Sequence, residues 1–304
     1  MKKALLFIVF LILIFIGLSF YLKSLFLPVL NDNKTVDFLI TKGSSVAQIG
    51  NKLESSGLIK SGIVFKFYVQ LSNSQSKIQA GEFQLSQNLS LIQILDQLKK
   101  GPKEIWVTIP EGLRKEEVAL KFASTLGKDS EFIKEFLNLT AGKEGYLFPD
   151  TYLFPKSATA TQIVNKLTST FDKKIGDITF EQVIVASLLE RETFSDFEKP
   201  IVAGIIDKRL KNDWPLQIDA TLQYAKGNWE PVYSKDKEIK SPFNTYKNLG
   251  LPPSPIASAG LSSLKAAINP EESDYWYYIH DNTGKIHFAR TLKEHNENIQ
   301  KYLN

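Results

Sequence analysis

The hydrophobic pattern starts with one long uncharged run. Residues 4–21 contain no charged side chain, and eighteen helical residues at ~1.5 Å each span ~27 Å, close to the ~30 Å hydrocarbon core of a bilayer. A secretory signal peptide is the alternative, but its apolar core is shorter and ends at a small-residue cleavage site. We therefore expect an uncleaved, single-pass transmembrane helix.

Two lysines set the predicted orientation of this helix. Lys2 and Lys3 precede the run and favour a cytoplasmic N-terminus, because positively charged flanks stay on the cytoplasmic side. Everything after about residue 28 then lies outside the cytoplasmic membrane. The predicted localisation is the cell (inner, cytoplasmic) membrane, with the rest of the chain extracytoplasmic.

After a polar linker at residues 31–34, a strand-like pattern followed by a helical pattern occurs three times. Period-2 alternation followed by a 3.6-residue period predicts a strand–turn–helix unit. The turns include Lys42-Gly43 and Glu111-Gly112. The strands are expected at 36–41, 81–85 and 105–109, and the helices at 45–53, 90–98 and 115–122. This pattern fits a small α+β module or, more specifically, a carbohydrate-recognition module of the LysM type.

From residue 125 the pattern becomes mainly helical. Asp281-Asn282-Thr283-Gly284 separates two strand-like runs and predicts a β-hairpin, and Thr291 with Glu294 predicts a capping box before the last helix. Helices are expected at 130–139, 161–172, 181–193, 198–210 and 292–303, and the hairpin strands at 275–280 and 285–289. Tyr146, Phe148 and Tyr152 are either sugar-stacking or core aromatics.

Composition narrows the function classes. The chain has 37 Lys and Arg, 33 Asp and Glu, and no cysteine, which excludes disulfides, thiolate zinc sites and a thiol nucleophile. The nearly balanced charge lacks the clustered positive excess of proteins that bind nucleic acid non-specifically. The histidines, His280, His287 and His295, all fall near the C-terminus, and HExxH, GxGxxG, GxxxxGK(S/T) and GxSxG are absent. We therefore expect no metal, no other cofactor and no nucleic-acid partner.

Carboxylates are the remaining candidates for chemistry. The helix expected at 181–193 is apolar on nearly every side, yet it carries Glu190 and Glu192 in its last turn. Burial and the negative end of the helix dipole keep a glutamic acid protonated, as a general acid requires. At ~100° per residue, Glu190 lies near the small Ala186 and Ser187, which leave room for a substrate, and Glu192 lies nearly opposite. Alternatively, Glu190 pairs with a buried arginine or lysine, for example Arg209.

With these residues in view, the chain resembles the MltG/YceG-like family of endolytic murein transglycosylases. The segments that carry the resemblance are EGYLFPDTYLFP at 144–155, ASLLERET at 186–193, LQIDATLQYA at 216–225, SPFNTYKNLGLPPSPIASAG at 241–260, LSSLKAAINP at 261–270, the hairpin YWYYIHDNTGKIHFA and EHN at 294–296. The chain departs from the family pattern at Ala220, where the family has proline, at Ser254, Ser258 and Ala259, and in the hairpin at 281–288. None of these departures removes a carboxylate.

The resemblance implies a reaction and a catalytic residue. Glu190 matches the family's catalytic glutamate, and Glu192 is the second glutamate of the motif. The implied activity is that of a membrane-anchored peptidoglycan lytic transglycosylase, a carbon–oxygen lyase acting on polysaccharide. It would cleave the MurNAc–GlcNAc β-1,4 bond of nascent glycan strands, leave 1,6-anhydro-MurNAc ends and terminate glycan elongation. A hydrolytic muramidase and a non-catalytic glycan-binding scaffold for cell-wall synthases remain alternatives.

The resemblance also implies a supporting site, domains and partners. We expect the supporting or substrate-binding residues to be Glu192, Gln217, Asp219, Ser241, Asn244, Thr245 and Tyr246. The α+β chain should comprise a cytoplasmic N-terminus and transmembrane anchor at 1–30, a LysM-like region at 31–125, and a mainly helical transglycosylase catalytic domain with a small β-hairpin at 126–304. Its partners should be peptidoglycan glycan strands, cell-wall synthases (penicillin-binding proteins) and the cytoplasmic membrane.

Overall fold

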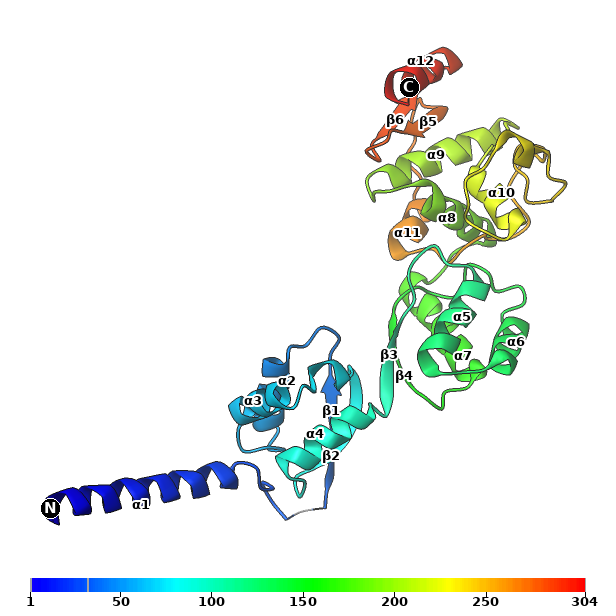
Figure 1. The fold of residues 1–304 in the computed structure, drawn as a ribbon. Helices are drawn as coiled ribbons and strands as arrows, with labels where there is room; N and C mark the ends of the chain where they lie inside the picture. The colour runs from blue at the N-terminus through cyan, green and yellow to red at the C-terminus, as the bar shows by residue number, and fades with distance from the viewer. Residues whose placement is uncertain (1, 32, 304) are drawn as a thin grey trace. The chain divides into compact units, whose positions relative to one another are not determined.

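The computed structural model describes residues 2–31 and 33–303, with side chains from residue 10 onward, and divides into two compact units. The first unit comprises Met1–Trp106 and Leu153–Ser157, and the second comprises Val107–Tyr152 and Ala158–Asn304. The boundaries fall within strands β3 (Glu104–Thr108) and β4 (Thr151–Pro155). Helices and small antiparallel sheets occur together (Figure 1), which confirms the predicted α+β class.

Helix α1 (Lys2–Ser24) coincides with the uncharged run. Its apolar side chains from Phe10 to Leu22 are largely exposed. Within the part of the chain whose side chains are described, no helix has the length and apolarity that crossing a membrane requires. The side chains of residues 2–9, where the predicted transmembrane helix begins, lie outside that description.

The first unit is a small sheet with helices around one apolar core. Strand β1 pairs antiparallel with β2, so that Phe38 faces Phe83, and the order within its four-stranded sheet is β1-β2-β3-β4. Its further elements are β1 (Thr35–Ile40), α2 (Val46–Ser55), α3 (Gly62–Leu71), the short 3-10 helix η1 (Gln75–Lys77), β2 (Gly81–Ser86) and α4 (Leu91–Lys100). Ser45 and Ser90 cap α2 and α4 with complete capping boxes.

Helix α3 was not expected from the pattern, and its contact with α2 requires glycine. A Cβ on Gly62 would lie 2.6 Å from the carbonyl carbon of Gly50, so only two glycines allow the helix backbones to approach this closely. The third predicted strand–turn–helix unit is not equivalent to the first two, because its helix, α5, belongs to the second unit.

The second unit is mainly helical. Its elements are α5 (Lys115–Leu126), α6 (Ser130–Leu139), α7 (Ala160–Ile175), α8 (Phe180–Glu192), α9 (Glu198–Lys211), α10 (Asp219–Lys226), the 3-10 helix η2 (Ser234–Glu238), α11 (Leu261–Ile268), β5 (Tyr277–His280), β6 (Ile286–Ala289) and α12 (Leu292–Tyr302). The predicted helices and hairpin strands agree with these bounds within a few residues. Helices α10 and α11 and strand β4 were not predicted.

Helix α8 is the centre of this unit's core. Figure 1 shows α8 beside α9 and α11, and its side chains Val183, Ala186, Leu188 and Leu189 are fully buried. A helix that is apolar on all sides is stable in water only when other elements cover every face. The surrounding helices therefore position the C-terminal turn of α8 with its two glutamates.

Two smaller predictions have clear outcomes. The aromatics Phe148 and Tyr152 are 3% and 4% exposed, so they belong to the core and do not stack on sugars. Thr291 caps α12 by accepting a hydrogen bond from the Glu294 N–H at 3.2 Å. In a complete capping box the Glu294 carboxylate would accept from the Thr291 N–H. Here it accepts from the N–H of the preceding residue, Arg290.

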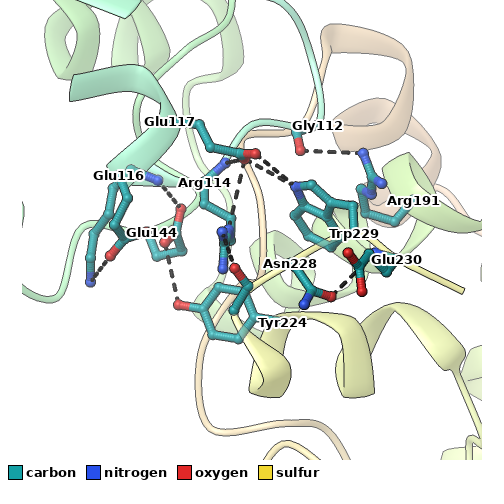
Figure 2. A network of polar contacts seen from close by, with 12 residues as sticks. Gly112, Arg114, Glu116, Glu117, Glu144, Arg191, Tyr224, Asn228, Trp229 and Glu230 are labelled. Carbon is teal, nitrogen blue, oxygen red and sulfur yellow. Dashed lines mark hydrogen bonds and ion pairs between the residues drawn. The ribbon is translucent and has the colours of Figure 1, made fainter. Parts of the chain in front are cut away.

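A buried carboxyl lies beside the N-terminus of α5. Glu144 is 4% exposed and accepts a hydrogen bond from the Lys115 N–H at 3.1 Å. It also accepts one from the Tyr224 hydroxyl at 3.3 Å (Figure 2). Burial, with the nearby charge of Glu116 second, raises the pKa of Glu144 to about 7. The folded protein therefore keeps this carboxyl protonated over a pH range in which the unfolded chain ionises it.

This raised pKa predicts a loss of stability with rising pH. Between pH 4.5 and about 7 the folded state binds the proton more tightly than the unfolded state, so the free energy of unfolding falls by up to about 3 kcal/mol across this window and stays low above it. In Glu144→Gln, which is neutral at every pH, that part of the decline should disappear. Urea unfolding at pH 5 and pH 8 measures the difference, with the exposed Glu131→Gln as the charge-loss control. Equal pH dependence in the wild type and Glu144→Gln would contradict the assignment.

Candidate active site

Glu190 is anchored by the start of helix α11. Its Oε2 atom accepts hydrogen bonds from the Gly260 N–H at 2.9 Å and from the Ser263 hydroxyl at 2.7 Å. The Lys199 ammonium lies 4.0 Å from the same oxygen, and the Glu190 side chain is only 9% exposed. The carboxyl is therefore fixed in place, and two donors and one cation are ready to stabilise its ionised form.

The alternative that Glu190 pairs with a buried arginine or lysine is met by Lys199, whose side chain is 7% exposed. Arg209, the example named for it, instead donates to the carbonyl oxygens of Leu216 and Trp276. The structure corrects a second expectation. Ser187 does not leave room for a substrate. It is fully buried, and its hydroxyl donates to the Ile184 carbonyl and accepts from the Ile256 N–H at 3.0 Å. The loop before α11 packs on this side of α8, which the helical periodicity of α8 alone could not indicate.

A second carboxyl, which sequence reasoning missed, meets Glu190. Glu111 is an exposed residue in the turn after β3, and its side chain contacts that of Glu190 beside Gly260. Burial of the carboxyl, followed by the negative charge of Glu190, raises the pKa of Glu111. In the sequence the Glu111-Gly112 pair indicated only a turn. Nothing in the spacing of residues 111 and 190 linked the two carboxyls.

Beside this pair, a pocket of about 800 Å³ opens next to the last turn of α8. Four predicted supporting residues, Glu192, Gln217, Asp219 and Tyr246, line it together. The other lining residues are mostly aromatic or charged: Arg191, Phe194, Arg209, Leu216, Lys237, Tyr277, Tyr278, Ile279, His280, Leu292 and His295. Glu190 is not among the lining residues, although the adjacent Arg191 is.

The acidic groups of the pocket are paired with tyrosines. The Tyr278 hydroxyl donates to Glu192 at 2.9 Å, and the Tyr246 hydroxyl donates to Asp219 at 2.6 Å. Burial raises the pKa of Glu192, and the charge of Asp219 acts in the same direction. The pocket thus offers hydroxyl and carboxyl groups at fixed positions, which suits a polyhydroxylated ligand.

Gln217 is held in a strained conformation at this pocket. Its φ of 55° lies in the left-handed region, which costs a residue other than glycine about 1–2 kcal/mol. Its N–H donates to the Thr245 carbonyl at 3.2 Å, and the next N–H, of Ile218, donates to the Thr245 hydroxyl at 3.0 Å. These hydrogen bonds offset the strain and fix the backbone segment that leads to Asp219.

The remaining predicted residues lie behind the pocket or away from it. Asn244 and Thr245 are 0% and 1% exposed. The Asn244 amide donates to the carbonyls of Lys237 and Ile239. Ser241 accepts from the Phe243 N–H within its own loop. These side chains hold the loop that presents Tyr246 and do not line the pocket.

A polar network ties the turn that carries Glu111 to the end of α8 (Figure 2). The Arg191 guanidinium stacks over the Trp229 ring at 3.8 Å and donates to the Gly112 carbonyl at 3.5 Å. The Trp229 indole N–H donates to Glu117 on α5 at 3.0 Å. Cation–π stacking of this kind holds the arginine in one orientation. Arg191, which follows Glu190 in the chain, is thereby bound to Gly112, which follows Glu111.

Three comparisons with known proteins agree on one family. The model of the YceG-like family matches residues 38–301. The endolytic murein transglycosylase of Bacillus subtilis (strain 168) is 35% identical over 326 aligned residues, which cover 94% of this chain and 90% of that protein. The endolytic murein transglycosylase of Streptococcus pneumoniae serotype 2 (strain D39) is 30% identical, with 98% of this chain and 64% of that protein covered.

A solved structure shows the same fold. The crystal structure of a YceG-like protein from Listeria monocytogenes is similar with a TM-score of 0.56 at 30% identity, covering 88% of this chain and 99% of that chain. The family model and a relative above 30% identity both match this sequence along most of its length. The chain therefore belongs to the YceG-like family.

Proposed function

We propose that the chain is a membrane-anchored endolytic peptidoglycan lytic transglycosylase and that Glu190 is its catalytic acid and base. The observation that carries this proposal is the setting of Glu190. Its nearly buried carboxyl is held by two hydrogen bonds, has an ammonium 4.0 Å away, and is adjacent in sequence to Arg191, which lines the polar pocket. The names of the relatives, endolytic murein transglycosylases, support the same reaction.

The reaction uses one proton twice. Protonated Glu190 donates to the oxygen of the β-1,4 bond between MurNAc and GlcNAc as this bond breaks. The resulting carboxylate takes the proton of the muramoyl C6 hydroxyl, whose oxygen attacks C1 and closes the 1,6-anhydro ring. The nucleophile is part of the substrate, so proximity replaces the capture of water. Between the two steps, the Gly260 N–H, the Ser263 hydroxyl and Lys199 stabilise the carboxylate.

The contact between the two carboxyls favours this lyase over a muramidase. Hydrolytic glycosidases hold their carboxyls about 5–5.5 Å apart when one is the nucleophile, and about 6.5–9.5 Å apart when a water lies between them. The side chain of Glu111 instead contacts that of Glu190, so this pair does not show the wider separation that either hydrolytic arrangement uses.

The pocket supplies the binding surface in this proposal. Gln217, Asp219 and Tyr246 would bind sugar hydroxyls, and Phe194, which is 76% exposed, offers an aromatic face beside them. Asn244, Thr245 and Ser241 would support this surface from their loop. Glu192, paired with Tyr278, would orient the pocket and not transfer the proton.

We place the first unit at the membrane surface. The uncharged run at 4–21 would anchor the chain in the cytoplasmic membrane, and the exposed apolar side chains between Phe10 and Leu22 are suited to lipid. The order β1–α2–α3–β2, two short strands around two helices, supports a LysM-like module that holds glycan. An enzyme anchored in this way would terminate nascent strands beside the cell-wall synthases, the penicillin-binding proteins.

The first prediction of the proposal distinguishes the catalytic roles of the two glutamates of α8. Glu190→Gln keeps the shape but cannot transfer a proton, so release of anhydro-MurNAc ends should fall by roughly 10²–10⁴-fold. Glu192→Gln should lose only several-fold, because its amide can still contact Tyr278. Mass spectrometry of products from purified glycan strands measures both, and thermal unfolding confirms that each variant is folded. Near-normal turnover by Glu190→Gln would refute its assignment.

The same spectra distinguish the alternative functions. A muramidase product carries one more water than an anhydro end, so a product heavier by the mass of water would replace the lyase by a hydrolase. Strand binding without any cleavage by the wild-type protein would identify a glycan-binding scaffold.

The second prediction of the proposal concerns topology. A reporter that works only in the cytoplasm, fused after Asn304, should stay silent, and a reporter that works only outside should be active, because Lys2 and Lys3 hold the N-terminus inside. Deleting residues 1–30 should release the protein from the membrane fraction. A strong cytoplasmic signal from the full chain would reverse the orientation and remove the enzyme from its substrate.

A further inference from the structure

The side chain of Glu111 reaches Glu190 from a part of the chain that the proposed reaction does not yet use. The turn after β3 carries Glu111, which is exposed as a residue although its carboxyl contacts the nearly buried Glu190. Two carboxyl groups form a hydrogen bond only when one of them carries a proton. A single proton shared by Glu111 and Glu190 would turn their contact into such a bond.

Gly260 shows how closely the two carboxyls converge. Its N–H donates to Glu190 Oε2 at 2.9 Å, and a Cβ on the same residue would lie 1.9 Å from Glu111 Oε1. Its φ of −73° is ordinary for any residue, so the backbone conformation does not require glycine here. The absence of a side chain is what leaves space for the Glu111 carboxyl.

The turn that carries Glu111 is held on both sides. The Gly112 N–H donates to the Ser258 carbonyl, and the Ser258 N–H donates to the Leu113 carbonyl, each at 2.8 Å. Arg191, stacked on Trp229, donates to the Gly112 carbonyl (Figure 2). An exposed carboxyl on a free turn would sample many rotamers, but this backbone directs Glu111 at one position.

We propose that Glu111 is a positioning residue of the reaction, which forms with Glu190 an acid–carboxylate pair that holds one shared proton. The inference rests on the proposed role of Glu190. When the glycosidic bond breaks, the proton leaves the pair for the leaving oxygen, and both carboxyls are briefly ionised. The C6 hydroxyl then gives its proton back to the pair as its oxygen bonds to C1. No proton or electron is gained or lost over the cycle.

The pair of carboxyls can retain a proton for the reaction. The two donors and Lys199 beside Glu190 can stabilise one negative charge. Two like charges in contact repel, so a second negative charge on the pair is costly and one proton is retained on the pair. The charged groups that face it are Lys199 in the first turn of α9, Asp196 in the loop before α9, and Arg191 on α8.

The test is the pH profile of anhydro-end formation by the full chain. Glu111→Gln removes the repulsion between the two carboxyls and leaves an amide that donates to Glu190, so the shared proton should be lost at lower pH. The pH above which activity declines, called here the alkaline limb of the profile, should move down by about one pH unit or more. The reason is that a neighbouring charge moves a carboxyl pKa by roughly 1–3 units. Activity at pH 7 should then fall about tenfold or more and recover towards pH 5. Glu111→Asp should restore part of the alkaline limb.

A second variant displaces Glu111 without changing it. Gly260→Ala keeps the N–H that binds Glu190, but its methyl group occupies the position of the Glu111 carboxyl. It should shift the alkaline limb as Glu111→Gln does, and the double variant should be no worse than either single one, because both remove the same interaction. Glu116→Gln, on the exposed first turn of α5, is the control and should retain the wild-type profile.

The outcomes separate this inference from the proposed function. If the wild type forms no anhydro ends, the proposed function fails. If the wild type is active and Glu190→Gln is not, but folded Glu111→Gln keeps the wild-type alkaline limb, the shared proton is refuted and the function stands. An equal loss at every pH in folded Glu111→Gln also overturns the inference, because it would make Glu111 a structural residue only.

Discussion

The second unit depends on one constraint: α8 is apolar on every side and still ends in glutamates. Burial of Val183, Leu188 and Leu189 requires neighbours on every face, and the same neighbours then surround the last turn. A carboxyl in such a place is stable only when donors or cations compensate for lost water. The Gly260 N–H, the Ser263 hydroxyl and Lys199 provide this at Glu190, and Tyr278 provides it at Glu192.

This constraint divides the end of α8 into two environments. Glu190 faces the start of α11 and the Glu111 turn, where two carboxyl groups and one ammonium meet. Glu192 faces the pocket, among tyrosines and Asp219. Arg191 lies between them and stacks on Trp229. Two glutamates on one helical turn can therefore do different work, because the elements packed against each one differ.

Much of the fold and part of the site could be predicted from the pattern. The helix that carries Glu190, the C-terminal hairpin and the α+β class follow from local periodicity and turn chemistry. The resemblance to the YceG-like family rested on several short motifs in order, and it is confirmed. Helices α3, α10 and α11 were missed, because α3 is apolar on most sides and the other two have only eight residues each, too short for a clear period.

By itself, the sequence determined which residues can do chemistry. Without cysteine, and with its histidines gathered near the C-terminus, it left carboxylates. The apolar helix pointed to Glu190 and Glu192, and the resemblance to the family selected Glu190. Only the tertiary structure decided what that carboxyl meets. The Glu111 turn is 79 residues from Arg191 along the chain, and Gly260 is 70 residues from Glu190. Periodicity describes the faces of one element, whereas the proton state of a carboxyl depends on the charges and donors that other elements bring to it.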